Sequence, residues 1–385
     1  MSEIKIFKCL LKNLRKVYTN KNKKYYLHPP ILDKSDKISL VNCIDSQFVS
    51  SAGKLVDKFE NYLKKITKSK YVISVINGTS ALHLSLKLMG IRENEEVLIP
   101  SFNFVASSNA CLYVGAIPHY VDSDDNLGID LKKLKSYLEK FTILKNNKCY
   151  NLKTKRYITA CIPTYSYGHA FDIFALISIC KKKKIKIIED SSEALGSFFK
   201  NKHAGTFGDI GVLSFNGNKI VTTGGGGAIL TNNSQIAKKA KHLSTTAKKE
   251  KNFIKIHDKL GYNYRMPNLN AALGLSQLKK LPQIIKNKRN LFLKLKKSLN
   301  GLENYFEVFE EIKGSKSNYW FQLLIIKKKN NTNKLLKFLK NNNIECQRAW
   351  QINSKFNYLK KFPKMRSLKS KNFLKSIICL PSNTF

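Results

Sequence analysis

The feature that most constrains this chain is the alternation of short β-branched segments with helical stretches between residues 57 and 190. Strands are expected at residues 71–76, 97–99, 117–121, 157–162 and 185–188. Helical spacing of apolar residues lies before or between them, at 57–68, 81–89, 107–114 and 171–183. Strands that alternate with helices form a mostly parallel sheet flanked by helices, so the sequence predicts an α/β fold.

The pattern changes past about residue 250. A long helical stretch over 270–297 carries many Lys and few Gly, and two β-rich segments follow at 319–326 and 377–380. The chain of 385 residues is long enough for about two domains. We therefore expect a basic, weakly patterned lead-in over 1–36, a large α/β domain over 37–250 and a smaller C-terminal α+β domain over 251–385.

The charge balance raises the question of a polyanionic partner. The 69 basic and 26 acidic side chains give a net charge of +43, which favours nonspecific binding of polyanions at low salt. The lysines are spread over the whole chain beside abundant Asn, and no nucleic-acid motif accompanies them. Codon bias in an AT-rich genome explains this pattern better, so we expect no specific nucleic-acid partner. An anionic substrate would still gain from the positive field.

Cysteine spacing and hydropathy indicate the compartment. The eight Cys residues are scattered and include no C-x-x-C pair, which favours a reducing cytoplasm over a disulfide scaffold and gives no metal site. The longest apolar region, 157–180, carries His169 and Asp172 in its middle. No secretory signal is visible at the N-terminus, so we expect a cytoplasmic protein without a membrane span.

Polar residues follow two of the predicted strands, where ligands bind in open α/β sheets. Gly78, Thr79 and Ser80 lie at a helix start, where backbone N–H groups and hydroxyls can hold a phosphate. A plain helix cap explains the same residues. Asp190 ends the strand over 185–188, and its carboxylate suits a metal ligand, a base, a partner for a cationic ring nitrogen or a structural cap.

A third segment carries a lysine between apolar residues and a glycine run. Lys219 follows Ser214 by five residues and precedes four consecutive glycines at 224–227. Burial would lower the pKa of this amine toward a usable base, although a solvated surface lysine is the plainer interpretation in so Lys-rich a chain. A phosphate-binding helix start, a strand-end Asp and a later Lys together match the needs of pyridoxal-phosphate chemistry.

These segments resemble a known family. They are NGTSALHLSL from residue 77, IPSFNFVASSNA from 99, IEDSSEALGS from 188, GTFGDIG from 205, SFNGNKIVTTGGGGAILT from 214 and GYNYRMPNLNAALGLSQL from 261. In this order they closely resemble the DegT/DnrJ/EryC1/StrS sugar aminotransferases, which have the fold-type I pyridoxal-phosphate architecture. The GNKIVTTGGGG form is most similar to the branch that aminates C4 of nucleotide-linked 4-keto-6-deoxy sugars in legionaminic-type acid synthesis.

The resemblance implies roles for individual residues. Lys219 would be the Schiff-base lysine and later the catalytic base, and Asp190 would hold the pyridine nitrogen protonated. Glu193 would hydrogen-bond the phenolic oxygen of the ring. The other cofactor-binding residues would be Gly78, Thr79 and Ser214 at the phosphate with Ser80 nearby, Phe104 on the ring face, and Asn263 reaching the phosphate of the neighbouring subunit.

The resemblance also implies a reaction and partners. L-Glutamate is the usual amino donor of the family, a nucleotide-linked keto sugar is the acceptor, and a homodimer carries its sites at the subunit interface. A C3- or GDP-sugar aminotransferase of the same family is an alternative. A catalytically silent, polyanion-binding relative is an alternative of another class. A dehydratase branch has His at the position of Lys219, so the lysine argues against that chemistry.

Two departures from the family pattern bear on activity. Tyr165 stands where the family commonly has His, which predicts altered substrate contacts. The sequence also ends at Leu380-Pro381-Ser382-Asn383-Thr384-Phe385, where relatives usually continue into a closing helix, so the chain is either naturally short or truncated. A missing helix would weaken the packing of the small domain and its closure over the substrate.

Overall fold

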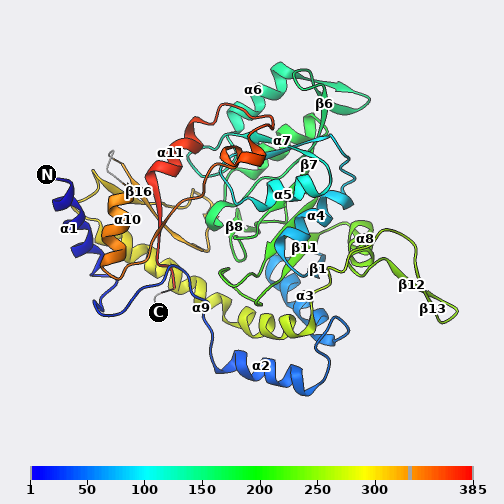
Figure 1. The fold of residues 1–385 in the computed structure, drawn as a ribbon, viewed down its shortest axis with the longest axis horizontal. Helices are drawn as coiled ribbons and strands as arrows, with labels where there is room; N and C mark the ends of the chain where they lie inside the picture. The colour runs from blue at the N-terminus through cyan, green and yellow to red at the C-terminus, as the bar shows by residue number, and fades with distance from the viewer. Residues whose placement is uncertain (1, 328–331, 384–385) are drawn as a thin grey trace.

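The computed structural model describes residues 2–327 and 332–383 (Figure 1). Its central sheet has the strand order β1 (Tyr71–Val75), β11 (Gly227–Thr231), β10 (Ile210–Ser214), β7 (Lys186–Asp190), β6 (Arg156–Cys161), β2 (Glu96–Pro100) and β3 (Ile117–Val121). Neighbouring strands from β10 to β3 run parallel, whereas β11 is antiparallel to both neighbours. The prediction of a mostly parallel α/β sheet is confirmed. The hairpin of β4 (Thr142–Lys145) and β5 (Lys148–Asn151) extends the sheet beside β6.

Helices cover both faces of this sheet. Successive strand residues point to opposite sides, and both sides carry apolar residues that must be buried. In β2, Val97 and Ile99 pack on one side and Leu98 on the other. The first face is covered by α4 (Gly78–Leu88), α5 (Ala106–Tyr113) and α8 (Ser234–Ser244). The opposite face is covered by α3 (Lys54–Thr67), α6 (Leu131–Phe141), α7 (Ile173–Lys182) and α9 (Asn268–Ser298). The strands and helices expected between residues 57 and 190 are thus confirmed, with small shifts at their ends.

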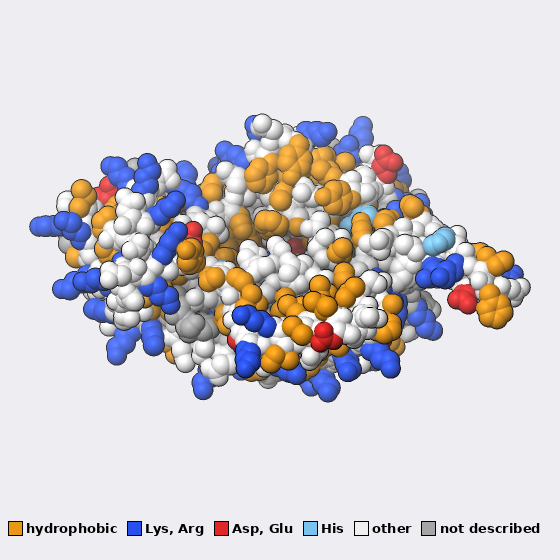
Figure 2. Space-filling model, turned by 60° about the horizontal axis from the view of Figure 1, so that its bottom comes forward, with side chains coloured by type: hydrophobic (Ala, Val, Ile, Leu, Met, Phe, Trp, Pro, Cys, Tyr) orange, Lys and Arg blue, Asp and Glu red, His pale blue; other side chains and the backbone are white. Residues whose placement is uncertain are grey.

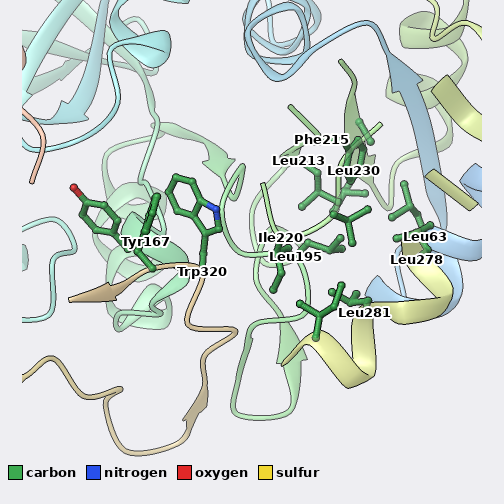
Figure 3. Close-up of a cluster of buried hydrophobic side chains, with 14 of the residues drawn as sticks. Leu63, Tyr167, Leu195, Leu213, Phe215, Ile220, Leu230, Leu278, Leu281 and Trp320 are labelled. Carbon is green, nitrogen blue, oxygen red and sulfur yellow. The ribbon is translucent and has the colours of Figure 1, made fainter. Parts of the chain in front are cut away.

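The side chains of one core cluster link the large sheet to the rest of the molecule. Figure 3 shows Leu63 of α3 with Leu278 and Leu281 of α9 near Leu213 and Leu230 of the sheet. Tyr167 and Trp320 belong to the same cluster, as do Phe321 and Leu323 from the C-terminal part of the chain. The core is therefore continuous from the large sheet to the C-terminal part of the chain.

A second, antiparallel sheet forms the C-terminal part. Its order is β14 (Phe306–Val308), β16 (Gln322–Ile326), β18 (Ile377–Leu380) and β17 (Gln347–Arg348). The sheet packs against α10 (Thr332–Asn341) and the C-terminal half of α9. Helix α11 (Leu368–Ser376) directly precedes β18. The β-rich segments expected near 319–326 and 377–380 are confirmed. We refer to this part as the small lobe and to the part around the large sheet as the large lobe.

The N-terminal segment differs from the weak pattern described above. Residues Glu3–Leu14 form helix α1, which buries Ile6, Phe7, Leu10 and Leu14 in the cluster around the small-lobe sheet. Four apolar residues on one helix face supply the physical reason, because a helix buries a single stripe. The segment that follows α1 contacts the small lobe again, where Tyr25 pairs with Ile344. Helix α2 (Lys34–Asp45) then packs along α9.

The remaining elements are short. Strands β8 (Phe198–Phe199), β9 (Lys202–His203) and β15 (Ser315–Lys316) form a small sheet that joins the two lobes. Strands β12 (Lys248–Lys251) and β13 (Ile254–His257) form a hairpin that projects from the body of the molecule (Figure 1). Short 3-10 turns lie at Ser166–Gly168, Asn353–Lys355 and Asn357–Leu359. Over residues 2–327 and 332–383, no helix has the length and apolar character needed to cross a bilayer.

Candidate active site

A cavity of about 460 Å³ opens at the carboxyl ends of β7 and β10. This is where ligands bind in open α/β sheets. Seven of the residues singled out above line it, namely Gly78, Thr79, Phe104, Asp190, Glu193, Ser214 and Lys219. The structure therefore brings together residues that lie up to 141 positions apart in the sequence, the difference between 219 and 78.

The first turn of α4 forms one wall of the cavity. Asn77 caps this helix, and its side-chain oxygen accepts the N–H of Ser80 at 2.7 Å. The N–H groups of the first turn have no acceptor within the helix, and the helix dipole makes this end favourable for an anion. A Cβ on Gly78 would lie 2.9 Å from the Cβ of Ser214, so glycine allows the two segments to meet. The result is an anion cradle of backbone N–H groups beside a serine hydroxyl.

Asp190 is the last residue of β7, and its carboxylate is held in place by two donors. The hydroxyl of Ser107 on α5 donates to Oδ2 at 2.7 Å, and the backbone N–H of Ser192 donates to Oδ1 at 3.3 Å. Asp190 thus presents an oriented anion to the cavity.

Lys219 and Glu193 form the ion pair of the site. The Nζ of Lys219 donates to Oε1 of Glu193 at 3.1 Å, and both side chains are largely buried, with exposed fractions of 11% and 4%. The other carboxylate oxygen of Glu193 accepts the N–H of Tyr167 at 2.8 Å. Burial raises the pKa of Glu193 to about 7, although the charge of Lys219 opposes the rise. Glu193 therefore changes its charge near neutral pH while it lies within hydrogen-bond distance of the Lys219 amine.

The other predicted residues lie in different places. Phe104 is 54% exposed at the cavity wall, and its ring centroid is 6.3 Å from that of Trp350. Ser80 is buried in the first turn of α4 and does not line the cavity. Asn263 is exposed and also outside the cavity, in a segment that pairs with Thr245. A role for Asn263 toward a neighbouring subunit stays a prediction.

Tyr165 does not line the cavity, although its neighbour Thr164 does. The Tyr165 side chain is fully buried, and its hydroxyl donates to Oε2 of Glu189 at 2.5 Å. The same carboxylate accepts backbone N–H groups of the loop that precedes β10, from Gly205, Phe207 and Gly208. In this chain the tyrosine anchors a loop behind the site, and it offers no hydroxyl to the cavity.

Sequence reasoning missed the wall that the small lobe supplies. It consists of Trp320, Phe321, Gln347 and Trp350. From the large lobe it also missed Asn77, Ala106, Thr164, Ser192, Asn216 and Asn218. Several of these directly follow or precede a predicted residue, so proximity to the motifs was a usable signal. The small-lobe residues carry no such signal, because only tertiary packing places them opposite Lys219.

The donor set suits pyridoxal phosphate. The cavity offers an amine for an aldehyde, a fixed carboxylate for a protonated ring nitrogen and an anion cradle for a phosphate. Its volume lies within the usual range for small-ligand sites, roughly 300–1,000 Å³. The residues of this chain therefore fit the cofactor that the sequence predicts.

Comparisons with known proteins agree. The model of the DegT/DnrJ/EryC1/StrS aminotransferase family matches residues 30–384. The chain is 35% identical over 327 residues to the GDP-perosamine synthase of Vibrio cholerae, covering 83% of each protein. It is 32% identical to the UDP-4-amino-4,6-dideoxy-N-acetyl-beta-L-altrosamine transaminase of Campylobacter jejuni (strain 81-176), covering 69% of this chain and 67% of the relative.

The fold agrees as well. The solved structure of Helicobacter pylori PseC, an aminotransferase of pseudaminic acid biosynthesis, superposes with a TM-score of 0.84 at 25% identity and covers 94% of each chain. This likeness confirms the fold-type I architecture, and the family is pyridoxal-phosphate dependent. The chain therefore belongs to the DegT/DnrJ/EryC1/StrS aminotransferase family, as a pyridoxal-phosphate-dependent enzyme of nucleotide-sugar transamination.

Proposed function

We propose that this enzyme transfers the amino group of L-glutamate to C4 of a nucleotide-diphosphate-linked 4-keto-6-deoxy sugar. The product would enter surface-glycan or nonulosonic, legionaminic-type acid biosynthesis. The observation that carries the proposal is the buried Lys219 amine, paired with Glu193 in a cavity that also holds Asp190. The name of the Campylobacter relative specifies an amino group at C4 of a 6-deoxy sugar, which supports the same position here.

Each residue of the large-lobe wall has a task in this reaction. When bound, pyridoxal phosphate supplies an aldehyde that takes up amines and a ring that accepts the electrons of the substrate's C–H bond. The N–H groups of Gly78 and Thr79 and the hydroxyl of Ser214 would hold its phosphate. Asp190 would keep a proton on its ring nitrogen, because the carboxylate is fixed by Ser107.

Proton transfer falls to Lys219 and Glu193. The Nζ of Lys219, once free and neutral, takes the α-proton of the amino donor. Glu193, whose pKa lies at about 7, accepts the hydrogen bond of the Lys219 amine and would orient that amine toward the donor. Phe104, at the cavity wall, would shield the bound cofactor from water.

We infer that a second copy of the chain completes the site. Among the described residues that line the cavity, Lys219 is the only one with a cationic side chain, yet the substrates bring carboxylates and a diphosphate. Figure 2 shows hydrophobic side chains gathered on one face of the molecule and on the projecting hairpin. The exposed apolar residues include Ile38, Val41, Ile44 and Phe48 in and after α2, Ile76 after β1, and Phe253 in the hairpin.

Such an apolar surface on a chain with 69 basic residues favours burial against a partner. In a homodimer, Asn263 of one copy would approach the phosphate site of the other, and basic residues of the hairpin would face the acceptor. Light scattering of the purified enzyme tests the dimer, and a monomer with full activity would contradict it.

Two half-reactions test the function. We expect L-glutamate to bleach the visible absorption of the enzyme-bound cofactor and to yield one 2-oxoglutarate per site. The aminated enzyme is then mixed with UDP- and GDP-linked 4-keto-6-deoxy sugars, and recovery of the absorption identifies the acceptor. NMR of the product locates the new amine at C4 or C3.

The same assay decides between the alternatives. A GDP-linked acceptor is favoured by the similarity to the Vibrio enzyme. Recovery only with GDP sugars, or an amine at C3, would replace the proposed substrate with that of another family member. A protein that stays colourless after incubation with pyridoxal phosphate would point to the silent, polyanion-binding relative.

A further inference from the structure

We propose that Trp320 is a positioning residue that holds the amine of Lys219 in its working place, and that the buried Lys288 fixes Trp320 from behind. The inference rests on the proposed role of Lys219 and assigns a task to the small-lobe wall of the cavity. It is carried by a chain of contacts that leads from α9 to the catalytic lysine.

Trp320 contacts the Lys219 turn at two points. The Nζ of Lys219 lies 4.2 Å from the centre of the Trp320 ring, close enough for a cation–π interaction of the ammonium form. The indole N–H of Trp320 donates to the backbone oxygen of Asn218 at 2.7 Å. The Trp320 side chain therefore contacts both the amine of Lys219 and the backbone of the preceding residue, Asn218.

The backbone of Trp320 is itself tied to the Glu193 segment. Its N–H donates to the side-chain oxygen of Asn318 at 2.9 Å. The side-chain amide of Asn318 donates to the carbonyls of Glu193 and Leu195, at 2.8 and 2.9 Å. The same loop thus links Trp320 to the residue that pairs with Lys219.

An uncommon backbone conformation directs the indole into the cavity. Tyr319 has a φ of +48°, in the left-handed region that bulky residues rarely adopt. Its ring stacks on Phe292 of α9, with centroids 4.4 Å apart. Such a conformation persists only where its surroundings enforce it, and it turns Tyr319 toward α9 and Trp320 toward Lys219.

Lys288 closes the chain of contacts. It lies on α9 with an exposed fraction of 0%, and its Nζ donates to the carbonyls of Trp320 and Ser382, at 3.0 Å each. The Nε2 of His28 lies 3.0 Å from the same amine. Burial lowers the pKa of Lys288 well below its usual value. Its amine thus has a structural role as a hydrogen-bond donor to two backbone carbonyls.

This arrangement limits where the Lys219 amine can go. A free lysine side chain samples many rotamers, and a proton transfer needs one of them. The indole face and Glu193 together confine the amine between two fixed groups. Loss of either support lets the amine move, and a displacement of about 1 Å can slow a reaction by on the order of 100-fold.

The kinetic test compares Trp320→Phe, Trp320→Leu and Lys288→Met with Lys286→Met, an exposed neighbour on the same helix. The readout is the exchange of the α-hydrogen of L-glutamate with solvent deuterium by the cofactor-loaded enzyme. We expect the exchange rate at saturating glutamate to fall by roughly 10- to 100-fold in Trp320→Leu and about threefold in Trp320→Phe. The KM for glutamate should stay within about twofold, because the variants alter positioning and leave donor binding intact.

Lys288→Met should resemble Trp320→Phe, and Lys286→Met should match the wild type. Trp320→Phe keeps a ring in place, so it remains informative if Trp320→Leu fails to fold. A rise in KM with an unchanged exchange rate would make Trp320 a wall of the donor pocket and would overturn the proposal.

A second readout needs no activity. The chain has two Trp residues, so Trp350→Phe leaves Trp320 as the only one. In cofactor-free Trp350→Phe, adding Lys219→Ala should raise Trp320 fluorescence at least about twofold, because a nearby ammonium quenches indole emission. Unchanged emission would overturn the contact on which the proposal depends. Absence of glutamate exchange in the wild type would instead count against the proposed donor.

Discussion

The two walls of the cavity differ in how their residues are placed. The large-lobe wall consists of residues that directly follow strands or begin a helix, such as Gly78, Asp190 and Ser214. The small-lobe wall consists of aromatic and amide side chains, Trp320 and Trp350 among them, that reach the cavity from the second sheet and its loops. Local motifs therefore build the wall that we propose holds the cofactor, whereas tertiary packing builds the wall opposite it.

Among changes to either wall, removal of the Lys219 amine should reduce turnover the most. Lys219→Ala deletes the proposed base, and we expect turnover with L-glutamate to fall by about 10³- to 10⁴-fold. Steady-state production of 2-oxoglutarate measures the loss. Lys238→Ala, an exposed lysine on α8, serves as the control and should behave like the wild type. Substantial turnover by the Lys219 variant would move the base to another residue.

Asp190→Asn should cause the second-largest loss of turnover. The amide cannot hold a proton on the ring nitrogen as a carboxylate does, so we expect turnover to fall by about 10²- to 10³-fold while the cofactor still binds. Ser107→Ala removes only the hydroxyl that orients Asp190 and should lose less. If Ser107→Ala proved as damaging as Asp190→Asn, the carboxylate charge would not be the decisive property.

Glu193 should give the large lobe a pH-dependent stability. Its pKa is 4.5 in the unfolded chain and about 7 in the folded one, so the native state binds more protons between these values. Stability from this group is therefore fully present below pH 4.5 and is lost as the pH rises toward 7. The shift corresponds to roughly 3 kcal/mol across that window.

Denaturant unfolding of cofactor-free Glu193→Gln and wild type, from pH 4.5 to 8, measures this contribution. The difference in unfolding free energy between the two proteins should change by that amount and then level off above pH 7. Glu139 on α6 is exposed and pairs with Lys135, so Glu139→Gln should leave the pH dependence of the unfolding free energy as in the wild type. A constant difference at all pH values would mean that Glu193 titrates normally.

The smallest effect concerns Trp350 in the small-lobe wall. One face of Trp350 stacks on Tyr167, with centroids 4.2 Å apart, and the residue lines the cavity. Trp350→Ala should raise the KM for the keto sugar by about three- to tenfold, since aromatic contacts contribute about 0.5–1.5 kcal/mol. The half-reaction with glutamate should change less than twofold. Equal losses in both half-reactions would contradict the assignment of Trp350 to the sugar side of the cavity.

The same division explains how far the sequence predicted the structure. Strand and helix periodicity located the large sheet, and the ends of its strands pointed to Gly78 and Asp190. The role of Lys219 opposite Asp190 followed from the family resemblance, and the structure places both residues on one cavity. The sequence offered no local sign of Trp320, because its position depends on α9, Lys288 and the strained turn at Tyr319. Helix α1 was recoverable in principle, since Ile6, Leu10 and Leu14 recur at helical spacing.

The partner of Tyr165 was not recoverable from pattern alone. Its hydroxyl lies against Glu189, whose carboxylate also collects N–H groups of the loop before β10. A tyrosine in a motif next to the site suggested a substrate contact, and only the fold shows that the side chain points to the buried loop. The boundaries proposed for the domains, at residues 36 and 250, stay a prediction.

Chemical trapping of the cofactor tests the central claim most directly. The enzyme is incubated with pyridoxal phosphate, reduced with borohydride, digested and mapped by mass spectrometry. We predict one dominant labelled site at Lys219, despite the abundance of lysines in the chain, and its loss in Lys219→Ala. Labels spread over many surface lysines, or concentrated at another lysine, would contradict the account.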